Sequence, residues 1–353
     1  MALLLKRFPI ASYLVLAYVF SWGVWCALPA IVGTNWTLLK IFVVIGMGPG
    51  LAAVLLDRMH GTAGRITSRW WMHFAFVFLS LLAINISSLI TGDARLAEEF
   101  AKASAPGVTT VGVFGSVVAA AVCAFIFASA AASERSSLNS IATRLPLKWC
   151  AIAVLLPAAL LLASYAIALI TREEMPPSIR AGLPLVTWLG FVTRAALFTL
   201  LAVAIGEETG WRGWLLPHLQ QRVNPLNASL ITGVVWGFWH FPLWLIHAYP
   251  GAPDGVVEYL FIGPLVAILF TWIVNRSGGS LAVAVLLHTA INSSQRLLPT
   301  TLMFPIFLTA LVVTVIFTER MWRRRGDALS AAYVRKSGLE SGDARVASRP
   351  CDA

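Results

Sequence analysis

The sequence is poor in charged residues. Asp, Glu, Lys and Arg make up only 12% of its 353 residues, whereas a soluble globular domain carries about 25%. Hydrophobic residues make up 58%, and the mean hydropathy is +0.79. A chain this apolar cannot cover its own surface with polar groups. The composition therefore excludes an ordinary soluble domain and indicates a protein that is solvated largely by lipid.

Cysteine is also scarce, and several common catalytic signatures are absent. The four cysteines are widely scattered and include no CxxC pair, which excludes a disulfide framework and a thiolate metal site. No HExxH sequence occurs, and no apolar run contains a GxSG or GxGD sequence. The signatures of zincins and of serine or aspartate intramembrane proteases are therefore missing.

Positive charge is in excess, with 26 Lys and Arg against 16 Asp and Glu. Its distribution does not form a nucleic-acid-binding stripe, since eight of the 26 basic residues follow Ile316, in a tail that also holds five acids. Most of the others fall in short gaps between apolar runs, where they act as determinants of membrane topology. We therefore expect membrane lipids, and no nucleic acid, as partners.

Apolar runs recur along most of the chain. A membrane-spanning helix needs about 20 apolar residues, and this criterion predicts spans at roughly 9–32, 38–56, 70–91, 108–132, 150–170, 185–206, 228–248, 257–275, 280–295 and 299–318. The ninth is short by this standard. The predicted fold class is all-α, a polytopic transmembrane helical bundle of about ten spans.

The charges between these runs predict the orientation. If the N-terminus is cytoplasmic, most basic gaps also fall on the cytoplasmic side, including those around Lys6, Arg58, Arg135, Arg212, Arg276 and Arg323. Most acidic gaps then fall on the opposite side. This bias predicts that both termini are cytoplasmic. The location expected for this multi-pass protein is a bacterial inner (plasma) membrane.

The chain divides into three parts by the polarity of its spans. Residues 1–180 form transmembrane spans with little buried polarity, and residues 181–318 form spans that carry ionisable groups. Residues 319–353 are polar and rich in Ser, Arg and Ala, which predicts a flexible basic cytoplasmic tail. We expect the functional core in the second part, because charge at membrane depth is costly and is kept where it is paired or used.

The first polar group of this core is the sequence Gly206-Glu207-Glu208-Thr209-Gly210-Trp211-Arg212. On a helix, residues four apart share a face, so Glu208 and Arg212 are predicted to form a structural ion pair. Glu207 points elsewhere and has no local partner. A carboxylate beside an apolar span needs a partner from another helix, a raised pKa, or water. Glu207 is therefore the stronger catalytic candidate.

Two further spans carry imidazoles. Trp236 lies one helical turn before His240, where its ring can pack under the imidazole. His288 and Asn292 are also four residues apart and share a face. Each pair alone is typical of an ordinary interhelical hydrogen bond. Together with Glu207 they place a carboxylate, two imidazoles and an amide on three consecutive spans, and convergence of such groups is what an active site requires.

The chemistry of this set suits hydrolysis. Glu207 could take a proton from water while His240 orients that water, and His288 and Asn292 could donate hydrogen bonds to an oxyanion. Alternatively Glu207, His240 and His288 could hold a zinc ion, which would lower the pKa of bound water to about 7. The residues leave open whether zinc is the cofactor or the reaction is metal-independent.

These motifs resemble those of the CPBP family, which comprises type II CAAX prenyl endopeptidases and bacteriocin-processing or self-immunity membrane proteins. The family pattern is EExxxR, then an aromatic residue three positions before a His, then HxxxN. In this chain it reads Glu207-Glu208 to Arg212, Trp236 to His240, and His288 to Asn292. The resemblance covers about residues 185–296. Trp236 stands where Phe is commoner, and we expect it to be tolerated as a packing residue.

The resemblance implies an all-helical intramembrane endopeptidase, of a family long called metalloproteases, that acts on a lipid-modified or other membrane-associated peptide or protein. It implies that Glu207 and His240 activate water, that His288 and Asn292 stabilise the oxyanion, and that Glu208, Arg212 and Trp236 support them. Two other functions stay open: a proton-coupled secondary transporter, and a non-catalytic immunity or scaffold protein of the same fold. The natural substrate and the oligomeric state also stay open.

Overall fold

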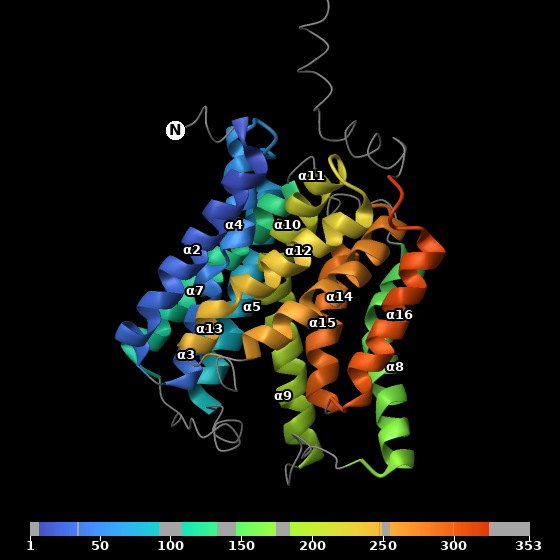
Figure 1. The fold of residues 1–353 in the computed structure, drawn as a ribbon. Helices are drawn as coiled ribbons and strands as arrows, with labels where there is room; N and C mark the ends of the chain where they lie inside the picture. Colours follow the sequence, from blue (N-terminus) through green and yellow to red (C-terminus); the bar gives the residue numbers. More distant parts are fainter. Residues whose placement is uncertain are drawn as a thin grey trace, which may run out of the picture.

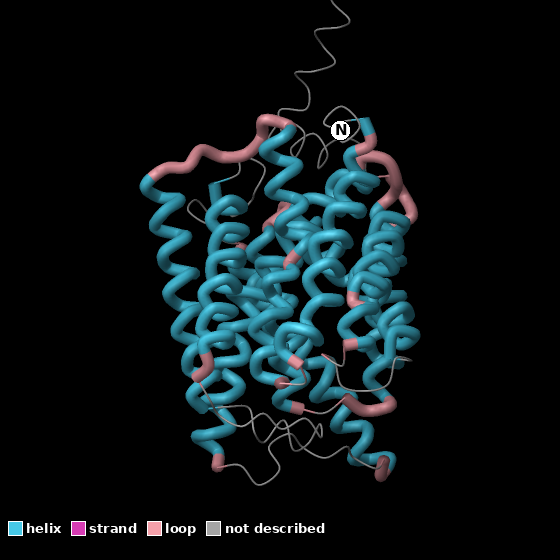
Figure 2. The backbone as a smooth tube through the Cα atoms, turned by 90° about the vertical axis from the view of Figure 1, so that its left-hand side faces the viewer, coloured by secondary structure: helices cyan, strands magenta, loops and turns pink. Residues whose placement is uncertain are grey.

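The computed structural model describes residues 7–33, 35–91, 108–132, 146–173, 184–246, 248, 255–298 and 300–324. All regular secondary structure in these ranges is helical, which confirms the predicted all-α class. The long helices lie side by side and run between the two ends of a bundle (Figures 1 and 2). The start of α2 and the end of α16 lie at the same end in Figure 1, as an even number of crossings requires.

The first half of the bundle consists of long apolar helices. In chain order these are α2 (Pro9–Val32), α3 (Trp36–Val43), the short η1 (Val44–Gly46), α4 (Gly48–Met59), α5 (Ser68–Thr91), α7 (Thr110–Ala132) and α8 (Leu147–Thr171). Asn35 caps α3 by accepting a hydrogen bond from the backbone N–H of Leu38 at 3.0 Å, which satisfies a donor that the helix itself leaves unpaired.

The second half holds the polar motifs. Its elements are α9 (Leu185–Phe198), η3 (Thr199–Ala204), α10 (Ile205–Gly210), η4 (Trp211–Leu215), α11 (Leu216–Gln220), α12 (Pro225–Trp239), α13 (Phe241–Leu245), α14 (Gly255–Arg276), α15 (Leu281–Leu297) and α16 (Met303–Glu319). Between α14 and α15 the chain turns at Gly278 and Gly279, whose φ angles of 73° and 82° favour glycine. This turn sets where α15 begins and hence the depth of its polar residues.

Eight helical segments of the described chain, not ten, are long and apolar enough to cross a membrane, and each overlaps one of the first eight predicted spans. The predicted spans 280–295 and 299–318 correspond to α15 and α16, which have 17 residues each and fall short of the usual ~20. The chain is an integral, multi-pass membrane protein. Its orientation stays a prediction, and tail residues 325–353 lie outside the described residues.

Residues from both halves share one hydrophobic core. Close helix approach at small residues, a common device in membranes, joins α4 to α10. A β-carbon on Gly50 would lie 2.6 Å from the backbone oxygen of Gly206. A β-carbon on Gly210 would overlap the Pro49 carbonyl and the Tyr13 hydroxyl. Glycines here therefore fix α10 tightly against the first half. The predicted division near residue 180 lies outside the described residues and stays a prediction.

Candidate functional site

The two adjacent glutamates lie on an irregular helix. The short α10 carries Glu207 and Glu208, and it is flanked by two π-helical segments, η3 before it and η4 after it. Widened turns of this kind are uncommon inside helices and are often found at functional sites. They change the direction in which successive side chains leave the helix. In this chain the irregularity coincides with the only adjacent pair of acids in its apolar runs.

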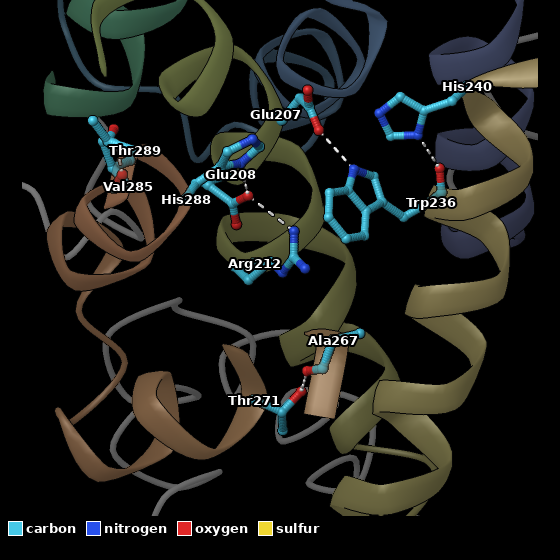
Figure 3. A network of polar contacts seen from close by, with 10 residues as sticks. All are labelled: Glu207, Glu208, Arg212, Trp236, His240, Ala267, Thr271, Val285, His288 and Thr289. Atoms are coloured by element: carbon cyan, nitrogen blue, oxygen red, sulfur yellow. Dashed lines mark hydrogen bonds and ion pairs between the residues drawn. The ribbon is translucent and has the colours of Figure 1, made fainter. Parts of the chain in front are cut away.

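Glu208 is the centre of a buried ionic cluster. Its Oε1 atom accepts a hydrogen bond from Nη1 of Arg212 at 2.9 Å, which confirms the predicted i, i+4 pair. The same oxygen lies 2.7 Å from Nδ1 of His288 on α15. Since Arg212 and Glu208 are both almost completely buried, each needs an opposite charge nearby. Glu208 therefore connects α10 and η4 to α15 (Figure 3).

Glu207 is directed away from this cluster and toward α12. Its Oε2 atom accepts a hydrogen bond from the indole Nε1 of Trp236 at 2.6 Å, and only 3% of the residue is exposed. Of the alternatives that the sequence leaves for Glu207, the structure shows a partner from another helix. The identity of that partner was missed, because the sequence suggests only a packing role for Trp236. The indole N–H was the available signal, since it is a donor that a buried tryptophan usually pairs.

His240 ends α12, with its ring toward the same side as Glu207 (Figure 3). Its Nδ1 atom lies 2.8 Å from the backbone oxygen of Trp236. A carbonyl can only accept, so Nδ1 carries the proton, and Nε2 of a neutral ring carries the lone pair. Aromatic rings surround the imidazole, with centroids at 4.8 Å for Trp239 and 5.2 Å for Tyr259. The ring is thus fixed with Nε2 as its basic atom.

Arg212 lies between two aromatic rings. Its guanidinium carbon is 3.7 Å from the ring centroid of Phe270 on α14 and 4.8 Å from that of Trp236. Cation–π contacts of this kind are strongest where water is excluded. Phe270 was not predicted from the sequence, since it lies within an apolar run and nothing in its neighbourhood distinguishes it. Through Arg212, α14 also contributes to the site.

Asn292 lies one turn after His288 on α15 and is half-buried. The backbone oxygen of Asn292 accepts a hydrogen bond from Nη1 of Arg296 at 2.6 Å. The assignment of Asn292 as a site residue therefore stays a prediction. The contacts do establish that five other residues lie together: Glu207, Glu208, Arg212, Trp236 and His288.

Several polar atoms beside the cluster are buried without a hydrogen-bond partner among the described residues. They are Oε2 of Glu208, Nη2 of Arg212, Nε1 of Trp211 and the hydroxyl of Tyr13. Tyr13, on α2, stacks on Trp214 at 4.7 Å and meets the edge of Trp211 at 5.8 Å. Buried polar groups are normally hydrogen-bonded, to water if not to protein.

The predicted zinc ligands do not fit a metal as the described residues stand. No group of three or more His, Cys, Asp or Glu side chains in the described ranges is arranged to hold a metal ion. Glu207 is directed to Trp236, His240 to a backbone carbonyl, and His288 to Glu208. Zinc binding by Glu207, His240 and His288 accordingly remains a prediction.

Comparison with known proteins agrees with the motifs. Residues 188–294 match the family described as type II CAAX prenyl endopeptidase Rce1-like. The chain is also similar to CAAX prenyl protease 2 of Methanococcus maripaludis, with 36% identity over 112 residues, and it spans 41% of that relative's length. These residues are 30% of the present chain. The matched segment contains Glu207, His240 and His288, and this similarity agrees with the resemblance to the CPBP family that the three ordered motifs carry.

Proposed function

We propose that this protein is an intramembrane endopeptidase that hydrolyses a peptide bond of a membrane-associated or lipid-modified peptide or protein. The observation that carries the proposal is the buried meeting of two carboxylates and an imidazole, from α10 and α15, beside a second imidazole, His240, directly after α12. Ionisable groups at this depth are costly. The matched segment and the name of its relative favour a CAAX-type protease.

Glu207 is the proposed general base. Its Oε2 atom is held by the indole of Trp236, which leaves Oε1 as the oxygen that takes a proton from water. His240 lies on the same side, with Nε2 as the atom that accepts a hydrogen bond from that water. The hydroxide so formed attacks the carbonyl carbon of the scissile bond, and Glu207 then passes the proton to the leaving amine.

His288 is the proposed oxyanion donor, with Asn292 beside it. Nδ1 of His288 donates to Glu208, so Nε2 is the atom that faces the substrate. Two carboxylates and one guanidinium leave a net charge of −1 in the buried set, and a proton on His288 balances it. Such an imidazolium donates through Nε2 to the developing oxyanion, where a single donor typically contributes 10²–10³-fold in rate.

The part played by zinc is a separate proposal. If zinc is bound, Glu207, His240 and His288 are the residues that would hold it, and the ion would supply a Lewis acid and an activated water. In the described ranges these side chains are not arranged as a metal-binding group, and no step above depends on a metal. The proposed location is the inner (plasma) membrane of a bacterium, with surrounding lipids and a lipidated or hydrophobic peptide as partners.

The test compares purified wild-type protein with Glu207→Gln in lipid nanodiscs, using a library of prenylated, acylated and unmodified peptides and mass spectrometry of the products. We expect cleavage by the wild type and none by Glu207→Gln. The matched control is Glu258→Gln, which changes an exposed carboxylate near the start of α14 and should cleave normally. Full cleavage by Glu207→Gln would refute the mechanism. Proton-coupled solute uptake without cleavage would favour a transporter.

A further inference from the structure

The indole of Trp236 has a polar role at the centre of the site. Its Nε1 atom lies 2.6 Å from Oε2 of Glu207, at the short end of the range for such bonds. An indole N–H can donate but cannot accept, so the direction of this bond is fixed. With Glu207 only 3% exposed, little water competes for its carboxylate. The indole therefore determines how the carboxylate of Glu207 is oriented.

A cation strengthens this donor. The guanidinium carbon of Arg212 lies 4.8 Å from the centroid of the Trp236 ring, and Arg212 is held there by Glu208 at 2.9 Å. A positive charge over an aromatic face is attracted by its electrons. It also draws density from the ring and makes the N–H a better donor. Glu208, Arg212, Trp236 and Glu207 thus form one continuous chain of contacts.

The same ring contacts both imidazoles. Its centroid lies 5.5 Å from that of His240 and 6.1 Å from that of His288, each in an edge-to-face arrangement. Trp236 is therefore the one aromatic residue of the described site that contacts both histidines and Arg212 while donating to Glu207 (Figure 3). Phenylalanine could reproduce the ring contacts, but it has no N–H to donate.

We propose that Trp236 is a positioning residue for the general base. Its indole N–H holds Oε2 of Glu207 and presents Oε1 to the attacking water. This inference rests on the proposed function, since it assigns Trp236 a role in the same hydrolysis. It differs from a packing role in a testable way, because only the N–H, and not the shape of the ring, is required.

The decisive experiment separates the N–H from the ring. Trp236 is replaced by Phe and, in a second variant, by benzothienylalanine, an isostere that has sulfur in place of N–H. Both variants are assayed in nanodiscs with a peptide that the wild type cleaves. Losing a hydrogen bond to a charged group should lower kcat about 10- to 100-fold with little change in KM. Wild-type kcat for the benzothienylalanine protein would overturn the proposal.

A second measurement does not depend on activity. The indole N–H of Trp236 is observed by NMR in protein labelled with ¹⁵N-tryptophan, and its resonance is assigned by its loss in Trp236→Phe. We expect the resonance to move upfield in Glu207→Ala, while Glu258→Ala leaves it in place. An unchanged resonance in Glu207→Ala would overturn the inference even if the enzyme is active. A wild-type protein that cleaves nothing would instead refute the proposed function, and the resonance would still test the contact.

Discussion

His288 and Arg212 share a single oxygen atom of Glu208. Nδ1 of His288 lies 2.7 Å from Oε1, and Nη1 of Arg212 lies 2.9 Å from the same atom. The bond from His288 joins residues that are 80 positions apart in the chain. Glu208 thus fixes α15 relative to α10, whereas Glu207 is held by α12. Adjacent residues of similar chemistry therefore have different tasks.

Glu208→Gln should destabilise the protein more than Glu207→Gln. The change removes the negative charge that Arg212 and His288 share through hydrogen bonds, and breaking a buried pair in this way costs about 3–5 kcal/mol. The measurement is the unfolding midpoint in an SDS titration of each variant in mixed micelles. Glu207→Gln, whose partner is an uncharged indole, is the matched control. Equal midpoints for the two variants would contradict the structural role assigned to Glu208.

His288→Asn should separate the two functions of His288. The Asn amide can donate to Glu208 in place of Nδ1 and so preserve the fold, but it has no second nitrogen to reach an oxyanion. We expect a near-normal unfolding midpoint and a loss of about 100-fold or more in kcat. His288→Ala should lower both quantities. Normal kcat in His288→Asn would show that Nε2 takes no part in the reaction.

Gly210→Ala should destabilise the bundle, because a β-carbon there would overlap the Pro49 carbonyl and the Tyr13 hydroxyl. Overpacking of this kind typically costs about 1–3 kcal/mol. Gly213→Ala is the matched control three residues further on, since the nearest atom to its β-carbon would lie at an ordinary 3.4 Å. The midpoint of SDS unfolding is measured for both. The close approach of α4 and α10 would be in doubt if both variants matched the wild type.

Zinc should leave the stability of the protein unchanged. A ligand that binds only the folded state raises stability by about 2.7 kcal/mol at 100 times its Kd. In the described ranges, however, Glu207, His240 and His288 are not arranged as a group that could hold a metal ion. We therefore expect the same unfolding midpoint for chelator-treated protein with and without added zinc, with metal content measured in parallel. A zinc-dependent rise in the midpoint would mean that these side chains rearrange around the ion.

The local features of the site were predictable from the sequence. Helical periodicity alone paired Glu208 with Arg212. The cost of a buried charge indicated that Glu207 lacks a local partner, and a partner from another helix was one of the alternatives that it left open. Contacts between helices were not predictable, because no local pattern encodes which faces meet. Phe270 is one example, and the bond between Glu208 and His288 is another.

The membrane spans likewise combine features that the sequence predicts with features that it does not. Apolar runs located the helices well, but 17-residue α15 and α16 are shorter than a typical span. Sequence reasoning gave no role to α2 beyond crossing the membrane. In the structure its Tyr18 hydroxyl donates to the backbone oxygen of Val235 at 2.6 Å, and Nε1 of Trp22 donates to that of Trp239 at 3.0 Å. Tertiary structure alone reveals such contacts.

These contacts bear on how the protein can be dissected. Ser21 on α2 accepts from Nε1 of Trp239 at 2.8 Å and also from the backbone N–H of Gly48 at 3.1 Å. Three side chains of α2, those of Tyr18, Ser21 and Trp22, thus form hydrogen bonds to the last turns of α12, directly before His240. A truncated protein that contains only the family-matched residues 188–294 would lose these hydrogen bonds. Engineering or transplanting the reaction centre therefore requires the N-terminal helix as well, although its sequence carries none of the motifs.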